Sequence, residues 1–185
     1  MSERAGDWIQ VFTGGQFWPL DPRPDEIHIE DIAHSLSLQC RFAGHTLVHY
    51  SVGEHSYLLS TLCSPDNALW GLLHDAAEAY LVDLPRPIKR FSRLGEEYRT
   101  IEARLMVCIC ECFGLPAVCP AEVKELDNLM LQWEQRDLMA LPPAQWKQHG
   151  AVLPIQTLVP FTPSENEHWF VRQFQFLWRL HCRHG

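Results

Sequence analysis

The stretch NALWGLLHDAAEAYLVDLPRPIK, residues 67–89, limits what this chain can fold into more than any other part of the sequence. It starts as an apolar run and then places His74, Asp75 and Glu78 within five positions. Charged groups beside a buried apolar run are costly unless they are paired or bind a metal ion. The fold must therefore bring either partners or a cation to this segment.

Signals for helix starts occur on both sides of this stretch. Ser51-x-x-Glu54 is a capping box, which predicts a helix that continues to about residue 63. Ser64 is followed by a proline, a pattern typical of a helix start, and predicts a single helix over residues 65–81. A second capping box, Ser164-x-x-Glu167, predicts the start of a C-terminal helix.

Apolar periodicity and chain breakers predict the remaining helices. They cover about residues 29–40, 93–113 and 120–139, and the C-terminal helix covers about residues 164–181. Residues 8–20, WIQVFTGGQFWPL, read as two short strands around Gly14-Gly15, the pattern of a β hairpin. The sequence predicts an all-α bundle with a small N-terminal hairpin, as one domain over residues 1–185 with its core at about 30–139.

Composition excludes several classes of partner. The net charge is −8 and no block of Lys and Arg occurs, so we expect no nucleic acid polymer as a ligand. No run of 18 apolar residues predicts a membrane span, and the N-terminus lacks the pattern of a signal peptide. The seven cysteines fit buried thiols in a reducing compartment, which predicts a cytoplasmic protein.

The charged end of the stretch has the composition of a metal site. His74 and Glu78 are four residues apart and share a helix face, and Asp75 is rotated by about 100° from His74. Other predicted helices carry His55 and Asp127, the latter in an apolar surrounding. Two imidazoles and two carboxylates suit one divalent Zn, Mn, Co, Fe or Ni ion better than Mg. Such a metal lowers the pKa of bound water and polarises a phosphoryl group.

Here the sequence resembles the HD-domain metal-dependent phosphohydrolases. The motif runs from His55 through His74-Asp75 to Asp127, and the likeness extends over about residues 30–135. The stretches that carry it are CRFAGH at 40–45, VGEHS at 52–56, LLHDAAEAYLVDLPRPIK at 72–89 and VKELD at 123–127. Within the family, the chain is most similar to small bacterial and phage 5′-deoxynucleotidases and dATP triphosphohydrolases. The resemblance implies an HD-type helical bundle with His55, His74, Asp75 and Asp127 as metal ligands.

The resemblance also implies roles around the metal. Glu78 would orient the attacking water or act as general acid or base, and Asp83 would sit near the scissile phosphate. Arg41 matches a phosphate-binding arginine, and Lys89 is a second candidate phosphate contact. Phe42 stands where the nucleotidases carry tryptophan, so selection of the sugar or base is expected to differ.

Together these residues predict a phosphohydrolase of nucleotides, with purine deoxynucleotides as substrates and attack at the 5′ α-phosphorus. A triphosphate would release tripolyphosphate and a nucleoside, and a monophosphate would release inorganic phosphate. Related small enzymes assemble, so the resemblance implies a homo-oligomer. The aromatic run HWFVRQFQFLWRL near the C-terminus fits either an interface or the core.

Other interpretations stay open. His55 is also compatible with a buried hydrogen-bonded histidine, Asp127 with an ion pair to Lys124, and Asp83 with a turn. Glu78 also fits an indirect structural role, and Arg41 and Lys89 also fit surface ion pairs. The alternative function is a catalytically silent HD module that binds a nucleotide as sensor or scaffold. Alarmone hydrolases carry a further acidic residue after the glutamate, where this chain has Ala79, which argues against that activity.

Overall fold

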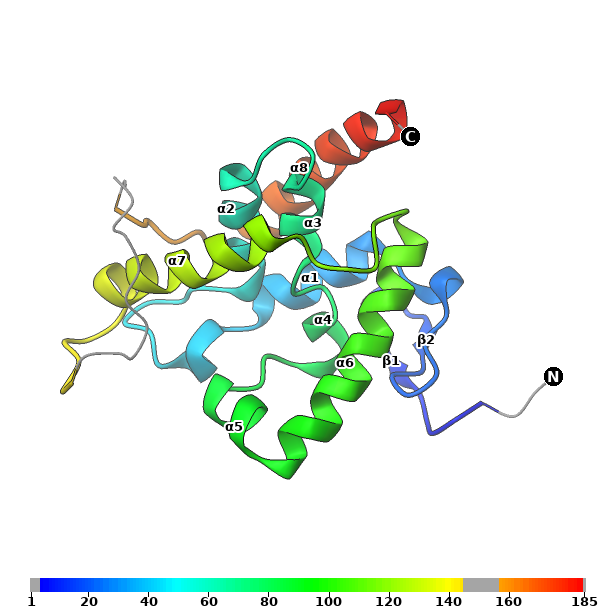
Figure 1. Cartoon of the computed structure of the whole chain (residues 1–185), viewed down its shortest axis with the longest axis horizontal. Helices are drawn as coiled ribbons and strands as arrows, with labels where there is room; N and C mark the ends of the chain where they lie inside the picture. Colours follow the sequence, from blue (N-terminus) through cyan, green and yellow to red (C-terminus); the bar gives the residue numbers. More distant parts are fainter. Residues whose placement is uncertain (1–3, 145–156, 185) are drawn as a thin grey trace.

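The computed structural model describes residues 4–144 and 157–184, and Figure 1 shows a helical bundle with a small hairpin near the N-terminus. The hairpin pairs β1 (Ile9–Gln10) with β2 (Gln16–Phe17). The α-helices are α1 (Ile29–Leu38), α2 (Val52–Leu62), α3 (Ala68–Leu73), α4 (Glu78–Leu81), α5 (Arg86–Phe91), α6 (Arg93–Cys112), α7 (Ala121–Leu138) and α8 (Pro163–His184). Short 3-10 turns lie at Pro24–Glu26 and Arg41–Gly44. The predicted all-α class with an N-terminal hairpin is confirmed.

Helix α2 lies among α1, α3, α7 and α8 and begins where the capping box predicts. The Ser51 hydroxyl accepts a hydrogen bond from the Glu54 backbone N–H at 3.0 Å. The Glu54 carboxylate accepts a hydrogen bond from the backbone N–H of Phe161 at 3.1 Å, so it ties α2 to the segment before α8. This cap fixes the first turn of α2, which carries His55.

The predicted single helix over residues 65–81 is wrong, because the structure divides it into α3 and α4. The Ser64 hydroxyl does not cap a helix but donates a hydrogen bond to the Glu122 carboxylate at 2.6 Å, and α3 begins only at Ala68. Between the two helices, residues 74–77 form tight turns in which Glu78 N–H bonds to Asp75 C=O, three residues earlier. The break separates His74 from Glu78 and lets each point to its own partners.

The second predicted capping box is also wrong. The Thr162 hydroxyl accepts a hydrogen bond from the Glu165 backbone N–H, and the Glu165 carboxylate accepts one from the Thr162 N–H. The box is therefore displaced by two residues from Ser164 and Glu167. Helices α6 and α7 lie close to their predicted ranges, whereas the short α5, which follows Pro85 and contains Pro87 in its first turn, was not predicted.

The hairpin packs against the helical bundle. Phe17 of β2 is fully buried and stacks on Tyr80 of α4, with ring centroids 4.0 Å apart. At the hairpin turn, the Thr13 backbone N–H donates to the carboxylate of Asp31 on α1 at 2.7 Å. Because a two-stranded hairpin is marginal in isolation, these contacts supply the support it needs.

The main hydrophobic core joins α1, α3, α6 and α8. Phe170 and Phe174 of α8 are buried in it, whereas Trp169 and Phe176 of the same helix are exposed. All seven cysteines are free thiols. Among the described residues, no helix is both long and apolar enough to cross a bilayer.

Candidate metal centre

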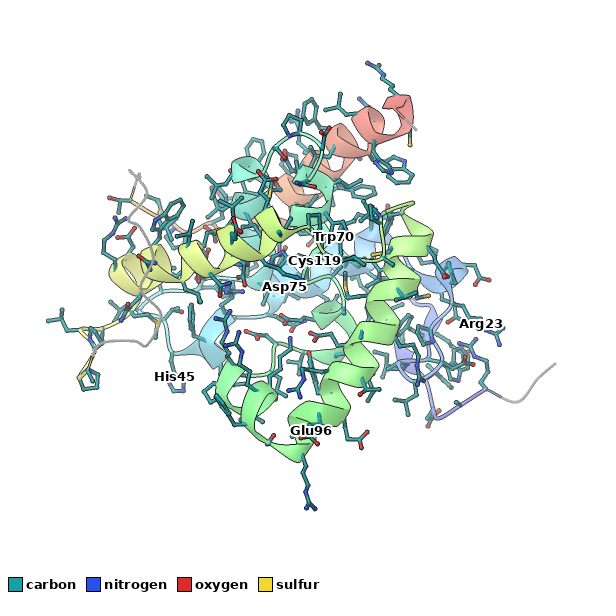
Figure 2. All side chains as sticks on the ribbon, in the orientation of Figure 1. Arg23, His45, Trp70, Asp75, Glu96 and Cys119 are labelled. Atoms are coloured by element: carbon teal, nitrogen blue, oxygen red, sulfur yellow. The ribbon has the colours of Figure 1, made fainter. Side chains whose placement is uncertain are left out.

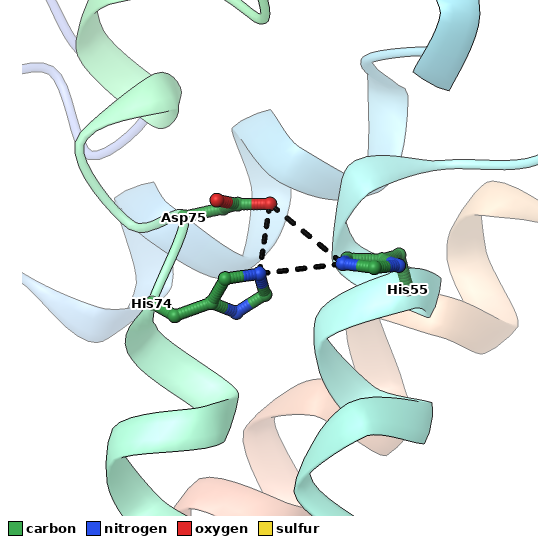
Figure 3. Close-up of side chains that lie close together, drawn as sticks. All are labelled: His55, His74 and Asp75. Carbon is green, nitrogen blue, oxygen red and sulfur yellow. Dashed lines mark hydrogen bonds and ion pairs between the residues drawn. The ribbon is translucent and has the colours of Figure 1, made fainter. Parts of the chain in front are cut away.

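Three side chains from α2 and the end of α3 converge on one point. Asp75 Oδ2 lies 3.1 Å from His74 Nε2 and 3.9 Å from His55 Nε2, and the two Nε2 atoms are 3.3 Å apart (Figure 3). All three donor atoms lie within 4.8 Å of one another. His55 is fully buried, and Asp75 lies near the centre of the molecule in the view of Figure 2.

The second nitrogen of each ring fixes which nitrogen faces the cluster. His74 Nδ1 lies 2.8 Å from the carbonyl oxygen of Gly71, which can only accept, so this nitrogen carries a proton. His55 Nδ1 donates to the Glu134 carboxylate at 2.7 Å. In the neutral rings both Nε2 lone pairs then point at each other, an arrangement that needs a proton or a cation between them.

The donor set fits a metal ion. Around one cation with bonds of about 2.1 Å, ligand atoms are separated by about 3.0 to 4.2 Å, and the three separations in the cluster fall in this range. Hydrogen bonds from the outer ring nitrogens of metal-binding histidines are typical of such sites. His55, His74 and Asp75 can therefore hold a metal ion.

Asp127 of α7 lies at the edge of this cluster. Its Oδ1 is 3.2 Å from His55 Nε2, and its Oδ2 is 3.5 Å from the Arg86 guanidinium. Among the described residues, the alternative ion pair with Lys124 is not formed. Asp127 is not one of the three residues whose donor atoms all lie within 4.8 Å of one another, so the structure places this predicted ligand beside the cluster.

Neighbouring charges set the protonation of these groups. Burial and the Arg41 guanidinium lower the pKa of His55, but Glu134 and Asp127 outweigh them and raise it to about 9. Burial raises the pKa of Asp127, yet the hydrogen bond with His55 brings it down to about 2. Burial likewise opposes ionisation of Asp75, and the adjacent imidazoles hold its pKa below the ordinary value. In the metal-free protein a proton on His55 thus takes the place of a cation.

Glu134 of α7 belongs to the centre and was not predicted. It is fully buried, and its carboxylate accepts hydrogen bonds from His55 Nδ1 and from the hydroxyl of Tyr50, at 2.7 and 3.0 Å. The Arg41 Nε lies 3.2 Å from the same carboxylate. Glu134 is seven residues after Asp127, so both lie on one face of α7. Two carboxylates at that spacing on a largely apolar face are the signal that could have identified it.

Arg41 is brought to the cluster by a strained turn. Its side chain is only 10% exposed and reaches Asp75 at 3.4 Å as well as Glu134. The next residues, Phe42 and Ala43, have φ values of 54° and 51°, a left-handed conformation that costs about 1–2 kcal/mol per residue. Arg41 is therefore no surface ion pair, and the Phe42 ring lies 5.5 Å from its guanidinium.

Glu78 lies next to the cluster as a buried carboxyl group. It is 4% exposed, and its Oε1 is 3.6 Å from Lys89 Nζ. Its Oε2 is buried without a hydrogen-bond partner in the described part of the chain. Burial, followed by the charges of Asp75 and Asp83, raises the pKa of Glu78 well above its ordinary value. The structure thus gives Glu78 a carboxyl group that keeps its proton to higher pH than a solvated glutamate.

A side-chain amide holds the backbone around Glu78 and Asp83. Gln39 Nε2 donates to the carbonyl of Glu78 at 3.0 Å, and Gln39 Oε1 accepts from the backbone N–H of Asp83 at 3.3 Å. Ser35 of α1 donates to the Ala79 carbonyl at 2.8 Å. Burial raises the pKa of Asp83. Gln39 was not predicted, and no local pattern marks it, because its partners lie about 40 residues away.

Lys89 of α5 contacts two carboxylates. Its ammonium lies 2.5 Å from Glu102 of α6 and 3.6 Å from Glu78. A separate cavity of about 460 Å³ lies between the hairpin and α1, lined among others by Phe12, His34 and Gln39. It contains none of the three residues of the cluster, so it is not the space in which a metal would be bound.

No family model matches this chain. It is 37% identical over 175 residues to the uncharacterized protein YfdR of Escherichia coli strain K12, an alignment that spans 94% of this chain and 97% of that protein. It is also 40% identical over 126 residues to an uncharacterized protein of Rhodobacter capsulatus, covering 63% of each chain. The names of these relatives state no activity, so function has to be argued from the site.

Proposed function

This chain belongs to the family of the E. coli protein YfdR, and we propose that it is a metal-dependent phosphohydrolase of nucleotides. The observation that carries the proposal is the convergence of His55 Nε2, His74 Nε2 and Asp75 Oδ2 beside the buried carboxyl group of Glu78. In the metal-free protein a proton on His55 satisfies the two Nε2 atoms held 3.3 Å apart, and a divalent cation would take the place of that proton. The resemblance of the sequence to HD-domain phosphohydrolases supports the same conclusion.

In the proposed site His55, His74 and Asp75 would hold one divalent transition metal, and Asp127, whose Oδ1 lies 3.2 Å from His55 Nε2, would be the fourth ligand. Zn, Mn, Co, Fe and Ni suit the mixture of nitrogen and oxygen donors. A cation bound there supplies Lewis-acid activation of water and of the phosphoryl group. Glu134 orients His55, and Gly71 orients His74, through the outer ring nitrogens.

The neighbouring residues of the chain supply proton transfer and anion binding. Glu78, with its raised pKa, acts as general acid or base at the reacting phosphoryl group. Gln39 keeps Glu78 and Asp83 in place through their backbone groups. Arg41 and Lys89 face the same region and balance the charge of the phosphate. Attack occurs at the 5′ α-phosphorus of a nucleotide, and the preference for purine deoxynucleotides rests on the family resemblance alone.

A substrate panel tests the proposal. Metal-stripped protein is incubated with each ribonucleotide and deoxynucleotide, as monophosphate and triphosphate, with Mn, Co, Ni, Zn or Mg added, and products are separated by chromatography. We expect release of a nucleoside that requires a transition metal. The variants His74→Ala and Glu78→Gln should lower kcat at least about 100-fold, since general acid–base catalysis contributes about 10²–10⁴-fold. The exposed residues His168 and Glu97 supply matched controls as His168→Ala and Glu97→Gln.

Two results would contradict the proposal. Absence of turnover with every metal and nucleotide, together with tight nucleotide binding by calorimetry, would favour the silent binding module instead. Turnover that survives His74→Ala would show that the cluster is not the catalytic metal site. Metal binding is measured separately on the same samples by elemental analysis after dialysis, so loss of the ion and loss of chemistry can be told apart.

A further inference from the structure

Three basic side chains border the candidate metal centre, and they differ in exposure. The side chain of Arg41 is 10% exposed, that of Lys89 is 25% exposed, and that of Arg86 is 34% exposed. Arg86 is the first residue of α5 and follows Pro85. Among the three, Arg86 therefore has the most access to a ligand that approaches from solvent.

Arg41 and Lys89 are held by buried carboxylates. Arg41 lies between Asp75 and Glu134, and Glu134 is fully buried. Lys89 lies 3.6 Å from the buried carboxylate of Glu78 and 2.5 Å from the carboxylate of Glu102, whose side chain is 20% exposed. Moving either cation outward would leave a buried carboxylate without its partner, which is costly. Both cations are thus suited to the phosphoryl group next to the metal and not to groups farther away.

Arg86 makes longer contacts at the outer side of the cluster. One guanidinium nitrogen is 3.5 Å from Asp127 Oδ2, and another is 3.3 Å from Asn128 Oδ1. The other oxygen of Asp127 is 3.2 Å from His55 Nε2, so one carboxylate separates the Arg86 guanidinium from the cluster. These two contacts are near the upper limit of hydrogen-bond length and are weaker than the short paired bonds that guanidinium groups form with phosphate oxygens, and Arg86 makes at least one further contact besides them.

We propose that Arg86 is a specificity-determining residue, which binds the phosphate groups beyond the α-phosphate and makes a nucleoside triphosphate the preferred substrate. The inference rests on the proposed function and adds the substrate class to it. When the α-phosphoryl group is at the cluster, the β-phosphate needs a cation farther out, and Arg86 is placed there. Arginine suits this task because its planar group binds phosphate through two parallel hydrogen bonds.

The reaction that follows is hydrolysis of the bond between the α-phosphorus and the 5′ oxygen. The oxygen of water bonds to the α-phosphorus and loses one proton. The 5′ oxygen leaves with the electrons of the broken bond and takes up one proton, which yields a nucleoside and tripolyphosphate. With a monophosphate the same step yields a nucleoside and inorganic phosphate, and Arg86 then has no β-phosphate to bind.

The test compares dATP with dAMP in wild-type protein, Arg86→Gln and Arg86→Lys, each loaded with the same metal. Arg86→Gln should lower kcat/KM for dATP at least tenfold more than for dAMP, mainly through KM, and Arg86→Lys should recover part of the loss. Arg90 lies on the same helix and is exposed, so Arg90→Gln is the matched control and should leave both substrates unchanged.

An equal loss for both substrates, with weaker metal binding, would overturn the inference, because it would show that Arg86 only positions Asp127. No change for either substrate would overturn it as well. If the wild-type protein hydrolyses neither nucleotide, calorimetry with tripolyphosphate and orthophosphate on metal-loaded protein still decides the matter. If Arg86→Gln loses affinity for tripolyphosphate but not for orthophosphate, the role of Arg86 is supported although the proposed hydrolysis fails. If the affinity of Arg86→Gln for tripolyphosphate is unchanged, the role of Arg86 is rejected together with the proposed hydrolysis.

Discussion

The carboxylate of Glu134 is the only fully buried acidic group around the candidate metal centre in the described part of the chain, and it joins His55, Tyr50 and Arg41. Removing one partner from a buried charged cluster costs about 3–5 kcal/mol, because the other charge stays buried without compensation. We therefore expect Glu134→Ala to lower the free energy of unfolding of the metal-free protein by that amount, measured by urea denaturation.

The same substitution should weaken metal binding about 10- to 100-fold, since His55 loses the acceptor that fixes its tautomer. Glu125→Ala, at an exposed position of the same helix, is the control and should change neither quantity. A Glu134→Ala protein with wild-type stability would show that Arg41 and His55 do not depend on this carboxylate.

Val82 carries backbone strain between the two candidate catalytic carboxylates, Glu78 and Asp83. Its φ and ψ are 75° and 151°, a region that is essentially restricted to glycine and costs about 1–3 kcal/mol for other residues. The side chain is 57% exposed, so its removal loses little buried apolar surface. We expect Val82→Gly to raise the free energy of unfolding by about 1 kcal/mol and to lower kcat, because Asp83 is then held less rigidly.

Val118 supplies the comparison for this substitution. It is 76% exposed and is not among the residues with positive φ, so Val118→Gly should destabilise the protein by about 0.5–1 kcal/mol through the entropy of the unfolded chain. Denaturation curves and steady-state kinetics of both variants give the measurement. Equal destabilisation by the two glycines would mean that Val82 is not strained.

At the scale of elements, helix α6 approaches the backbone of α5 closely at Gly95. A Cβ atom there would lie 2.4 Å from the carbonyl oxygens of Ile88 and Lys89, which belong to the α5 backbone and cannot rotate away. Gly95→Ala should therefore displace α5, lower stability by about 1–3 kcal/mol and reduce turnover, since α5 carries Lys89 and Arg86.

The metal affinity of Gly95→Ala should stay within about twofold of the wild-type value, because His55, His74 and Asp75 lie outside α5 and α6. A twofold change in affinity corresponds to about 0.4 kcal/mol. Gly15→Ala is the control, as its nearest neighbour is a Val11 side-chain atom at 3.4 Å. The readouts are metal affinity by titration and turnover of the best nucleotide substrate. Loss of metal binding together with turnover would place the metal elsewhere or show that α5 supports the whole fold.

Local signals predicted the elements whose ends are decided locally. Ser51 caps α2 and Gly114 follows α6, because a cap needs only the four or five residues around it. The same reasoning failed at Ser64, whose hydroxyl is bound by Glu122, a residue 58 positions away. It also missed the break at residues 74–77, where Gln39 and Ser35 bind the carbonyls of α4.

In the candidate site, too, local signals predicted some residues, and contacts between distant parts of the sequence determine the others. The apolar stretch indicated His74, Asp75 and Glu78, and the structure brings the first two to His55. Gln39, Glu134 and Arg86 contribute through contacts across the fold, which periodicity does not encode. Glu134 alone left a recoverable signal, its spacing from Asp127 on α7.

At the scale of the whole molecule, metal binding and stability are linked through His55. Burial and Arg41 lower its pKa, but Glu134 and Asp127 bring it to about 9, above the ordinary value of about 6.5. A raised pKa in the folded state means that this proton stabilises the metal-free fold fully below about pH 6.5. The contribution is lost as the pH rises through about 9. A divalent cation needs the same Nε2 atom without its proton, so binding below pH 9 releases a proton.

The increase in Tm caused by a fixed excess of Ni²⁺ should therefore be small at pH 6 and grow toward pH 8.5. Each pH unit changes the binding free energy by about 1.4 kcal/mol, which corresponds to roughly 3–5 °C for a chain of this size. Differential scanning calorimetry with and without the metal measures this increase in Tm. Groups that titrate in the same way in the metal-bound and metal-free proteins do not contribute to it. His74→Ala, which lacks one ligand, should show little increase at any pH. An increase that is the same at pH 6 and pH 8.5 in the wild-type protein would mean that the metal does not displace a proton from His55, and the cluster would then not be where the ion binds.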